Sequence, residues 1–149
     1  MLQRLLQDPE FKTLDKKHVR DVFILSGTNN VDGIFSGSQT MADVNKSLSE
    51  LLCKIWTIFE PARISVINIL PRDHRAKNNI VQQLNQFLLK ECNAHGLRYV
   101  ITEAYPEPMF SYADGSRNNN MFANGFDNVH LSNLGYSRIA GYLKYLAHL

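Results

Sequence analysis

The stretch that decides the predicted fold class is residues 64–70, which read Ile64-Ser65-Val66-Ile67-Asn68-Ile69-Leu70. β-branched residues dominate it, and such residues favour the extended backbone of a strand. Pro71 follows directly, and proline lacks the backbone N–H that a central strand uses for pairing. The sequence therefore predicts a strand over 64–70 that ends at the proline.

Two further apolar runs of strand length lie on either side of this stretch. Residues 22–25 form a four-residue run closed by Ser26 and Gly27, which is typical of a strand covered on both faces. Residues 97–101 form the third run. These three runs predict three strands.

Helical periodicity separates the strands. Apolar residues recur at spacings of three and four over 41–59, over 80–92 and over 134–146, as they do in amphipathic helices. The polar residues 28–39 and the irregular residues 102–126 predict loops. Such an alternating order predicts an α/β domain with a parallel sheet, in which ligands bind beyond the carboxyl ends of the strands.

Local signals mark where the helices begin and end. Thr40 suits an N-cap, Gly96 suits the position after a helix, and Ser132 or Asn133 suits the N-cap of the last helix. We expect Trp56 to anchor the 41–59 helix to the core.

Composition sets broad limits on the class of protein. The chain has 149 residues, 44% hydrophobic residues and a formal net charge of +2, which fits one ordinary globular domain and gives no preference for nucleic acid. Cys53 and Cys92 lie on apolar stretches and predict reduced core residues, so we expect an intracellular, cytoplasmic protein. No apolar run approaches the roughly 20 residues of a membrane span.

An acid and a histidine stand three residues apart just before the last predicted helix. At this spacing Asp127 can accept a hydrogen bond from one imidazole nitrogen of His130 while the other nitrogen faces outward, as in the orienting acid and base of a hydrolytic triad. Alternatively, Asp127 caps a turn and His130 is an ordinary surface histidine.

A second polar block, Gly27-Thr28-Asn29-Asn30, follows the first predicted strand. An asparagine amide and a backbone N–H at a strand end are suited to binding an oxyanion. The alternative is a turn in which the asparagines bond local backbone groups.

Together and in this order, the two blocks resemble those of the SGNH (GDSL-type) hydrolases. Residues 27–30 resemble the family's G-x-N-D block, and 127–136 resemble its D-x-x-H block, in the form D-x-V-H-L-S-x-x-G-Y. The likeness runs from about Asp21 to the C-terminus. It implies a flavodoxin-like, three-layer α/β/α fold for a single domain over 1–149. Residues 64–72 also resemble the esterase-like domains encoded in first open reading frames of some non-LTR retrotransposons.

The resemblance also implies roles for single residues. Asn29 matches the oxyanion-hole asparagine, His130 the general base and Asp127 its orienting acid. Gly27, Thr28 and Asn30 would then lie beside a small acyl or acetyl ester. No cofactor is implied, and the histidines do not have the spacing of a metal site.

The chain departs from the family at two places. Asn30 stands where the family usually has Asp, and no G-D-S block with a nucleophilic serine precedes Val22. We therefore expect the C-terminal portion of the family's domain, lacking its first strands, with reduced or absent activity. The serines that could replace the missing nucleophile are Ser26, Ser36, Ser38, Ser111 and Ser116. We expect none of them to lie in a turn between a strand and a helix, where a nucleophile would be held against His130.

The missing strands imply further possibilities for function. The strand at 22–25 would have an open apolar edge, which could pair with another chain and give self-association or an assembly role. A basic cluster, Arg72, His74, Arg75 and Lys77, lies at the next strand end and would suit RNA or another anion in a non-catalytic binding module. A solvated helix start is the simpler explanation of the cluster.

Overall fold

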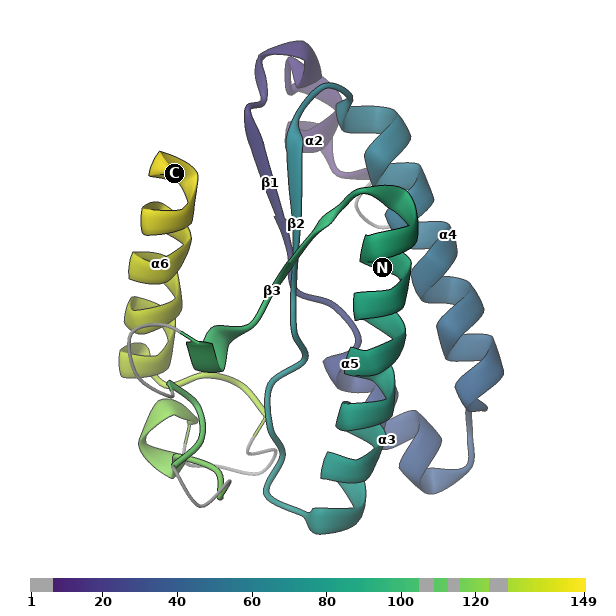
Figure 1. Ribbon diagram of the computed structural model, residues 1–149, viewed down its shortest axis with the longest axis vertical. Helices are drawn as coiled ribbons and strands as arrows, with labels where there is room; N and C mark the ends of the chain where they lie inside the picture. The colour runs from purple at the N-terminus through teal and green to yellow at the C-terminus, as the bar shows by residue number, and fades with distance from the viewer. Residues whose placement is uncertain (1–6, 105–108, 113–115, 124–128) are drawn as a thin grey trace.

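A parallel sheet forms the centre of the molecule (Figure 1). The computed structural model describes residues 7–104, 109–112, 116–123 and 129–149. Within them the sheet order is β1-β2-β3, with β1 at Asp21–Ile24, β2 at Arg63–Ile67 and β3 at Arg98–Val100. Val22 is in register with Ile64, and Val66 with Tyr99. The parallel α/β sheet predicted from the sequence is confirmed.

Helices cover both faces of this sheet. α4 and α5 lie on one side and α6 on the other (Figure 1). The helices are α2 (Pro9–Thr13), α3 (Thr28–Ser36), α4 (Met41–Phe59), α5 (Arg75–His95) and α6 (Asn133–His148), with short 3₁₀ segments at Lys16–His18, Thr102–Ala104 and Asn119–Met121. The result is a three-layer α/β/α arrangement.

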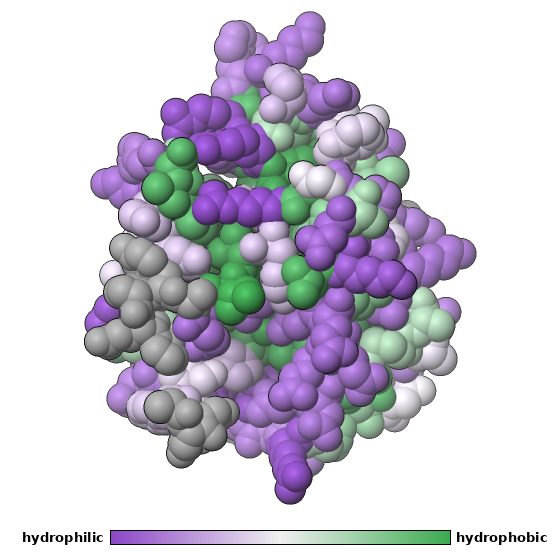
Figure 2. Space-filling model, in the orientation of Figure 1, coloured by the Kyte–Doolittle hydropathy of each residue, from purple (hydrophilic) through white to green (hydrophobic). Residues whose placement is uncertain are grey.

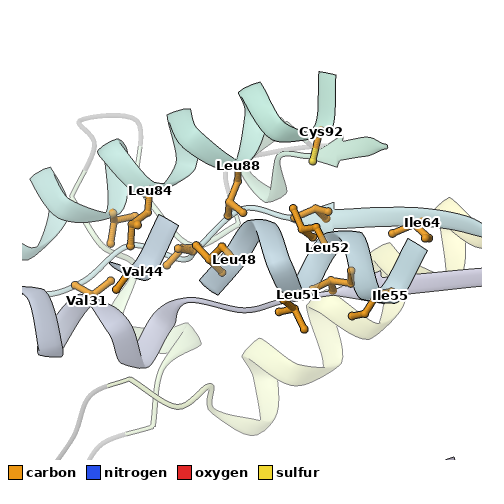
Figure 3. Close-up of a cluster of buried hydrophobic side chains, with 14 of the residues drawn as sticks. Val31, Val44, Leu48, Leu51, Leu52, Ile55, Ile64, Leu84, Leu88 and Cys92 are labelled. Atoms are coloured by element: carbon orange, nitrogen blue, oxygen red, sulfur yellow. The ribbon is translucent and has the colours of Figure 1, made fainter. Parts of the chain in front are cut away.

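Alternation along β2 divides the core into two clusters. Ile64 and Val66 belong to a cluster shared with α3, α4 and α5. Figure 3 shows Leu84 and Leu88 of α5 pointing toward α4 in this cluster. Ile67, from the opposite face, joins a cluster with α6. Both clusters exclude water from apolar side chains, which is the main favourable contribution to folding.

α5 is amphipathic, with a hydrophilic outer face and an apolar face toward the core. In the view of Figure 2, hydrophilic residues cover the side of the molecule occupied by α5, while hydrophobic residues gather near the middle, over β3. Val81, Leu84 and Leu88 are buried beneath it. The helix is therefore held by one apolar face, as its sequence predicts.

Most predicted boundaries of the helices are confirmed. Thr40 caps α4 by accepting a hydrogen bond from the N–H of Asp43, Gly96 ends α5 in the left-handed region, and Ser132 caps α6. The predicted loop over 28–39 is wrong, because residues 28–36 form α3. Its buried Val31 packs against the core, and the polar residues that suggested a loop surround it.

Two predicted core residues are exposed. Trp56 is 47% exposed and Cys53 is also exposed; both line a surface hollow with His95 and Leu97, at the end of α5. Cys92 is buried, and burial raises the pKa of its thiol to about 11. Periodicity alone placed too wide a stripe of α4 in the core.

Ion pairs fix the start of the edge strand. Asp21 on β1 accepts hydrogen bonds from Arg63 at 2.7 Å and from Arg20 at 2.9 Å. Both arginines also donate to the carbonyl of Ala147 near the end of α6. These contacts tie β1, β2 and α6 together at the amino end of the sheet.

Gly135 sets how closely α6 approaches the preceding chain. A Cβ at this position would lie 2.1 Å from the backbone oxygen of Met121, which is far inside van der Waals contact. Ser132 strengthens the junction, since its N–H donates to the same Met121 oxygen and its hydroxyl to the oxygen of Asn120. The glycine of the 127–136 motif is therefore a packing requirement.

We predict opposite effects of alanine at two glycines of α6. Gly135→Ala should lower the free energy of unfolding by roughly 2 kcal/mol or more, because backbone must move to admit the methyl group. Gly141→Ala is the matched control, since nothing lies within 4 Å of a Cβ there. It should raise the free energy of unfolding by about 0.5–1 kcal/mol through helix propensity. Urea denaturation measures both; equal effects of the two changes would contradict the packing described.

Candidate active site

A pocket of about 230 Å³ lies at the carboxyl end of the sheet. Its walls come from the turn after β1, the turn after β2 and the segment that leads into α6. The lining residues are Leu25, Ser26, Gly27, Thr28, Asn29, Asn30, Leu70, Pro71, Arg72, Phe122, Val129, His130, Leu131 and Tyr136. The pocket thus brings together the two sequence blocks that are about 100 residues apart in the chain.

The first wall depends on a sharp turn between β1 and α3. Gly27 has a φ of 106°, which residues other than glycine rarely adopt. A Cβ at this position would lie 2.6 Å from Cδ1 of Ile69. The turn places Thr28 and Asn29 in the first turn of α3, where Asn29 is exposed at the pocket. Asn30 also lines the pocket, and its amide donates to Oε1 of Gln39 at 3.1 Å, which joins the first turn of α3 to the chain beyond its last.

The second wall is the chain that follows β2, where the last backbone bond to β3 runs from the N–H of Asn68 to the carbonyl of Val100 at 3.0 Å. Asparagine side chains replace the lost backbone partners. Asn68 accepts from the N–H of Thr102, Asn85 bonds both the N–H and the carbonyl of Ile69, and Asn78 does the same for Arg72. The strand therefore ends at Ile67, before the predicted Leu70, and the side-chain amides satisfy the backbone beyond it.

The third wall carries His130. Leu131 forms an antiparallel bridge with Phe122, and the N–H of Ala123 donates to the carbonyl of His130 at 2.8 Å. His130 is exposed at the pocket. Asp127 lies outside the described residues, so its predicted pairing with His130 stays a prediction.

An aromatic contact supports this third wall from behind. The guanidinium carbon of Arg117 lies 4.3 Å from the centroid of the Phe122 ring, and Phe110 packs edge-on against the same ring. Glu103 fixes Phe110 by accepting a hydrogen bond from its N–H at 3.1 Å. Burial raises the pKa of Glu103, and hydrogen bonds from the Phe110 and Ser111 N–H groups partly oppose that rise.

The predicted basic cluster does not form one exposed surface. Arg72 is 4% exposed; it donates to both carboxylate oxygens of Asp32 and to the carbonyl of Thr28. Lys77 also pairs with Asp32, at 2.7 Å. The reason is that α3, predicted as a loop, packs against α5 and brings Asp32 to these cations.

The other two members of the cluster have separate surroundings. The Nδ1 atom of His74 accepts from the N–H of Ala76 and so caps α5, while its ring contacts Phe35 edge-on. Arg75 is exposed. An anion-binding role for the four residues together therefore has little support in their geometry.

The residues that hold the pocket together were not predicted from the sequence. Asp32, Asn68 and Asn85 each bond a group 16 or more residues away in the chain, which no local pattern reveals, and Asn78 bonds the backbone of Arg72 six residues before it. In the sequence alone Asp32 resembles an ordinary surface charge, and asparagine is common in loops. Only the topology shows what these side chains contact.

Two structural features are absent from the described part of the chain. No group of three or more His, Cys, Asp or Glu residues among the described ones is arranged to hold a metal ion. Likewise, none of the helices within the described ranges combines the length and apolar character needed to cross a bilayer.

We predict that Asp32→Asn destabilises the protein, because it leaves the buried Arg72 guanidinium without its carboxylate. The loss should be roughly 1–3 kcal/mol in the free energy of unfolding, below that of a fully buried pair since Asp32 is partly exposed. Glu50→Gln, the same acid-to-amide change at an exposed site on α4, should have an effect under about 0.5 kcal/mol. Denaturant titration at pH 7 compares the two.

The same pair predicts a dependence on pH. Burial alone would raise the pKa of Asp32, but hydrogen bonds from Lys77 and Arg72 outweigh it and hold that pKa below the ordinary 3.8. A lowered folded-state pKa stabilises the protein above pH 3.8, and this stabilisation is lost as the pH falls through the folded-state value. The difference between wild type and Asp32→Asn should therefore shrink below pH 3.8. A difference that grows there would contradict the assignment.

Comparison with known proteins gives similarity of fold. No protein-family profile and no curated protein matches the sequence. A solved structure of a Streptococcus pneumonia protein named after platelet activating factor matches with 19% identity and a TM-score of 0.67, over 87% of this chain and 60% of that one. A GDSL-like lipase from Bacteroides thetaiotaomicron matches with 17% identity and a TM-score of 0.71, over 99% of this chain and 68% of that one. The chain thus has the α/β fold of GDSL-like lipases and spans about two thirds or less of the length of these proteins.

Proposed function

We propose that the pocket is the substrate site of a GDSL-type ester hydrolase domain. The observation that carries the proposal is the convergence of residues 27–30 and 129–131 on one pocket, although about 100 residues separate them. The similarity of fold to GDSL-like lipases supports it independently. The chain would then be the C-terminal portion of such a domain.

The composition of the pocket suggests the class of substrate. Among the described residues of the lining, Arg72 is the one Lys, Arg, Asp or Glu, and its guanidinium is paired with Asp32. The other lining residues are polar and uncharged, aromatic or aliphatic, with one histidine, His130. A pocket of about 230 Å³ suits a short acyl group. The proposed substrate is therefore a small uncharged acyl or acetyl ester.

Each proposed role follows from chemistry at the pocket. His130 takes the proton of the attacking hydroxyl and later gives it to the departing alcohol, and Asp127 orients its ring. The amide of Asn29 donates to the carbonyl oxygen as negative charge develops there. Because the sequence has no G-D-S block, we propose reduced turnover compared with a complete GDSL-type site.

We predict hydrolysis of p-nitrophenyl acetate that depends on His130. His130→Ala should lower kcat/KM by about 100-fold or more, as expected when a general base is lost. Asn29→Ala should lower kcat by a similar factor through loss of an oxyanion donor. His148→Ala, an exposed histidine outside this pocket, is the matched control and should leave the rate unchanged. Wild-type and His130→Ala rates that both equal the buffer rate would contradict the proposal.

An assembly role is the second candidate, because β1 occupies an edge of the described sheet. It predicts a stable dimer in sedimentation equilibrium with slow amide exchange over 22–25, since pairing protects strand N–H groups. A monomer with fast exchange there would exclude it.

Three further proposals rest on the sequence alone. They are the narrower likeness to retrotransposon-encoded esterase domains, an RNA partner and a cytoplasmic setting.

A further inference from the structure

We propose that the hydroxyl of Ser26 is the nucleophile of this site, an inference that rests on the hydrolase function proposed above. The sequence did not indicate it, because the residues after Ser26 were predicted to form a loop. The structure places a helix there. Ser26 therefore lies between a strand and a helix, a setting that the sequence predicts for none of the candidate serines.

The first supporting observation is the path of the backbone. β1 ends at Ile24 and α3 begins at Thr28, so Ser26 lies in a short strand-to-helix turn. The turn is sharp because Gly27, with its φ of 106°, follows directly and packs against Ile69. Enzymes of the α/β-hydrolase fold use a sharp strand-to-helix turn to present a nucleophilic serine to a pocket.

The second observation is the shared pocket. Ser26 is 9% exposed and lines the same pocket as His130. Because the pocket is small, a short ester bound in it would lie against both residues. A hydroxyl and a base on one pocket are the two groups that nucleophilic catalysis requires.

The other candidate serines lie outside this pocket. Ser36 and Ser38 bond each other and the carbonyl of Gly33 at the far end of α3. Ser111 and Ser116 do not line the pocket. Of these five serines, only Ser26 lines the pocket together with His130.

Backbone N–H groups next to Ser26 could donate hydrogen bonds to an oxyanion. The first helical bond at this end of α3 runs from the N–H of Asn30 to the carbonyl of Gly27. The N–H groups of Thr28 and Asn29 precede it and have no acceptor within the helix. They add partial positive charge next to the place where an oxyanion would form.

The proposed reaction has two steps. The Ser26 oxygen bonds to the ester carbonyl carbon as His130 accepts the hydroxyl proton; the bond to the alcohol oxygen then breaks, and His130 returns the proton to the departing alcohol. Water next attacks the acyl-Ser26 ester and gives a proton to His130. The bond to Ser26 breaks, the acid leaves, and the serine oxygen regains the proton.

Covalent labelling of the unmodified chain tests the assignment directly. A fluorophosphonate probe should add one label, and tryptic digestion should place it on the peptide from Asp21 to Lys46. That peptide also contains Ser36 and Ser38, so fragmentation must locate the label at Ser26. No label, or a label at another residue, would overturn the inference without any variant having to fold.

Kinetics separates this inference from the proposed function. Ser26→Ala should lower p-nitrophenyl acetate hydrolysis by about 100-fold or more with an unchanged melting temperature, while Ser36→Ala keeps the wild-type rate. Activity that survives Ser26→Ala but not His130→Ala would overturn Ser26 as nucleophile and leave the hydrolase function standing. Activity absent from the wild type would contradict both.

Discussion

The buried guanidinium of Arg72 joins the turns that follow two neighbouring strands. It extends from the turn after β2 and bonds the Asp32 carboxylate and the Thr28 carbonyl, both on α3. A buried charge is stable only when it is paired and hydrogen-bonded, so neither turn can move independently without leaving that charge unpaired. The close approach of Gly27 to Ile69 fixes the same two turns from the apolar side. The first two walls of the pocket depend on these contacts.

The third wall depends on a different junction. Gly135 allows α6 to pack directly on the Met121 carbonyl, and the bridge between Phe122 and Leu131 then places His130 at the pocket. The motif around His130 thus combines a chemical group with the small residue and the cap that position it.

The sequence predicted the parts of the fold that depend on local patterns. The parallel sheet, α4, α5 and α6 follow from strand-length apolar runs, helical periodicity and caps such as Thr40 and Ser132, all of which act within a few residues. α3 was missed because polar residues surround Val31, and its burial depends on tertiary packing. The role of Arg72 was missed for the same reason, since Asp32 reaches it only when α3 is helical. The candidate site was predictable in outline, because the carboxyl ends of parallel strands share one edge of the sheet. The setting of Ser26 could not be predicted, because it depends on the helix that follows.

Amide NMR with a short-chain alkyl phosphonate ester tests most directly whether the three walls form one site. We predict that shift changes on binding gather at the backbone amides of Gly27, Arg72 and His130, one on each wall of the pocket. Changes gathered instead around the separate hollow at Cys53 and Trp56, or no change at any of the three amides, would contradict a single site.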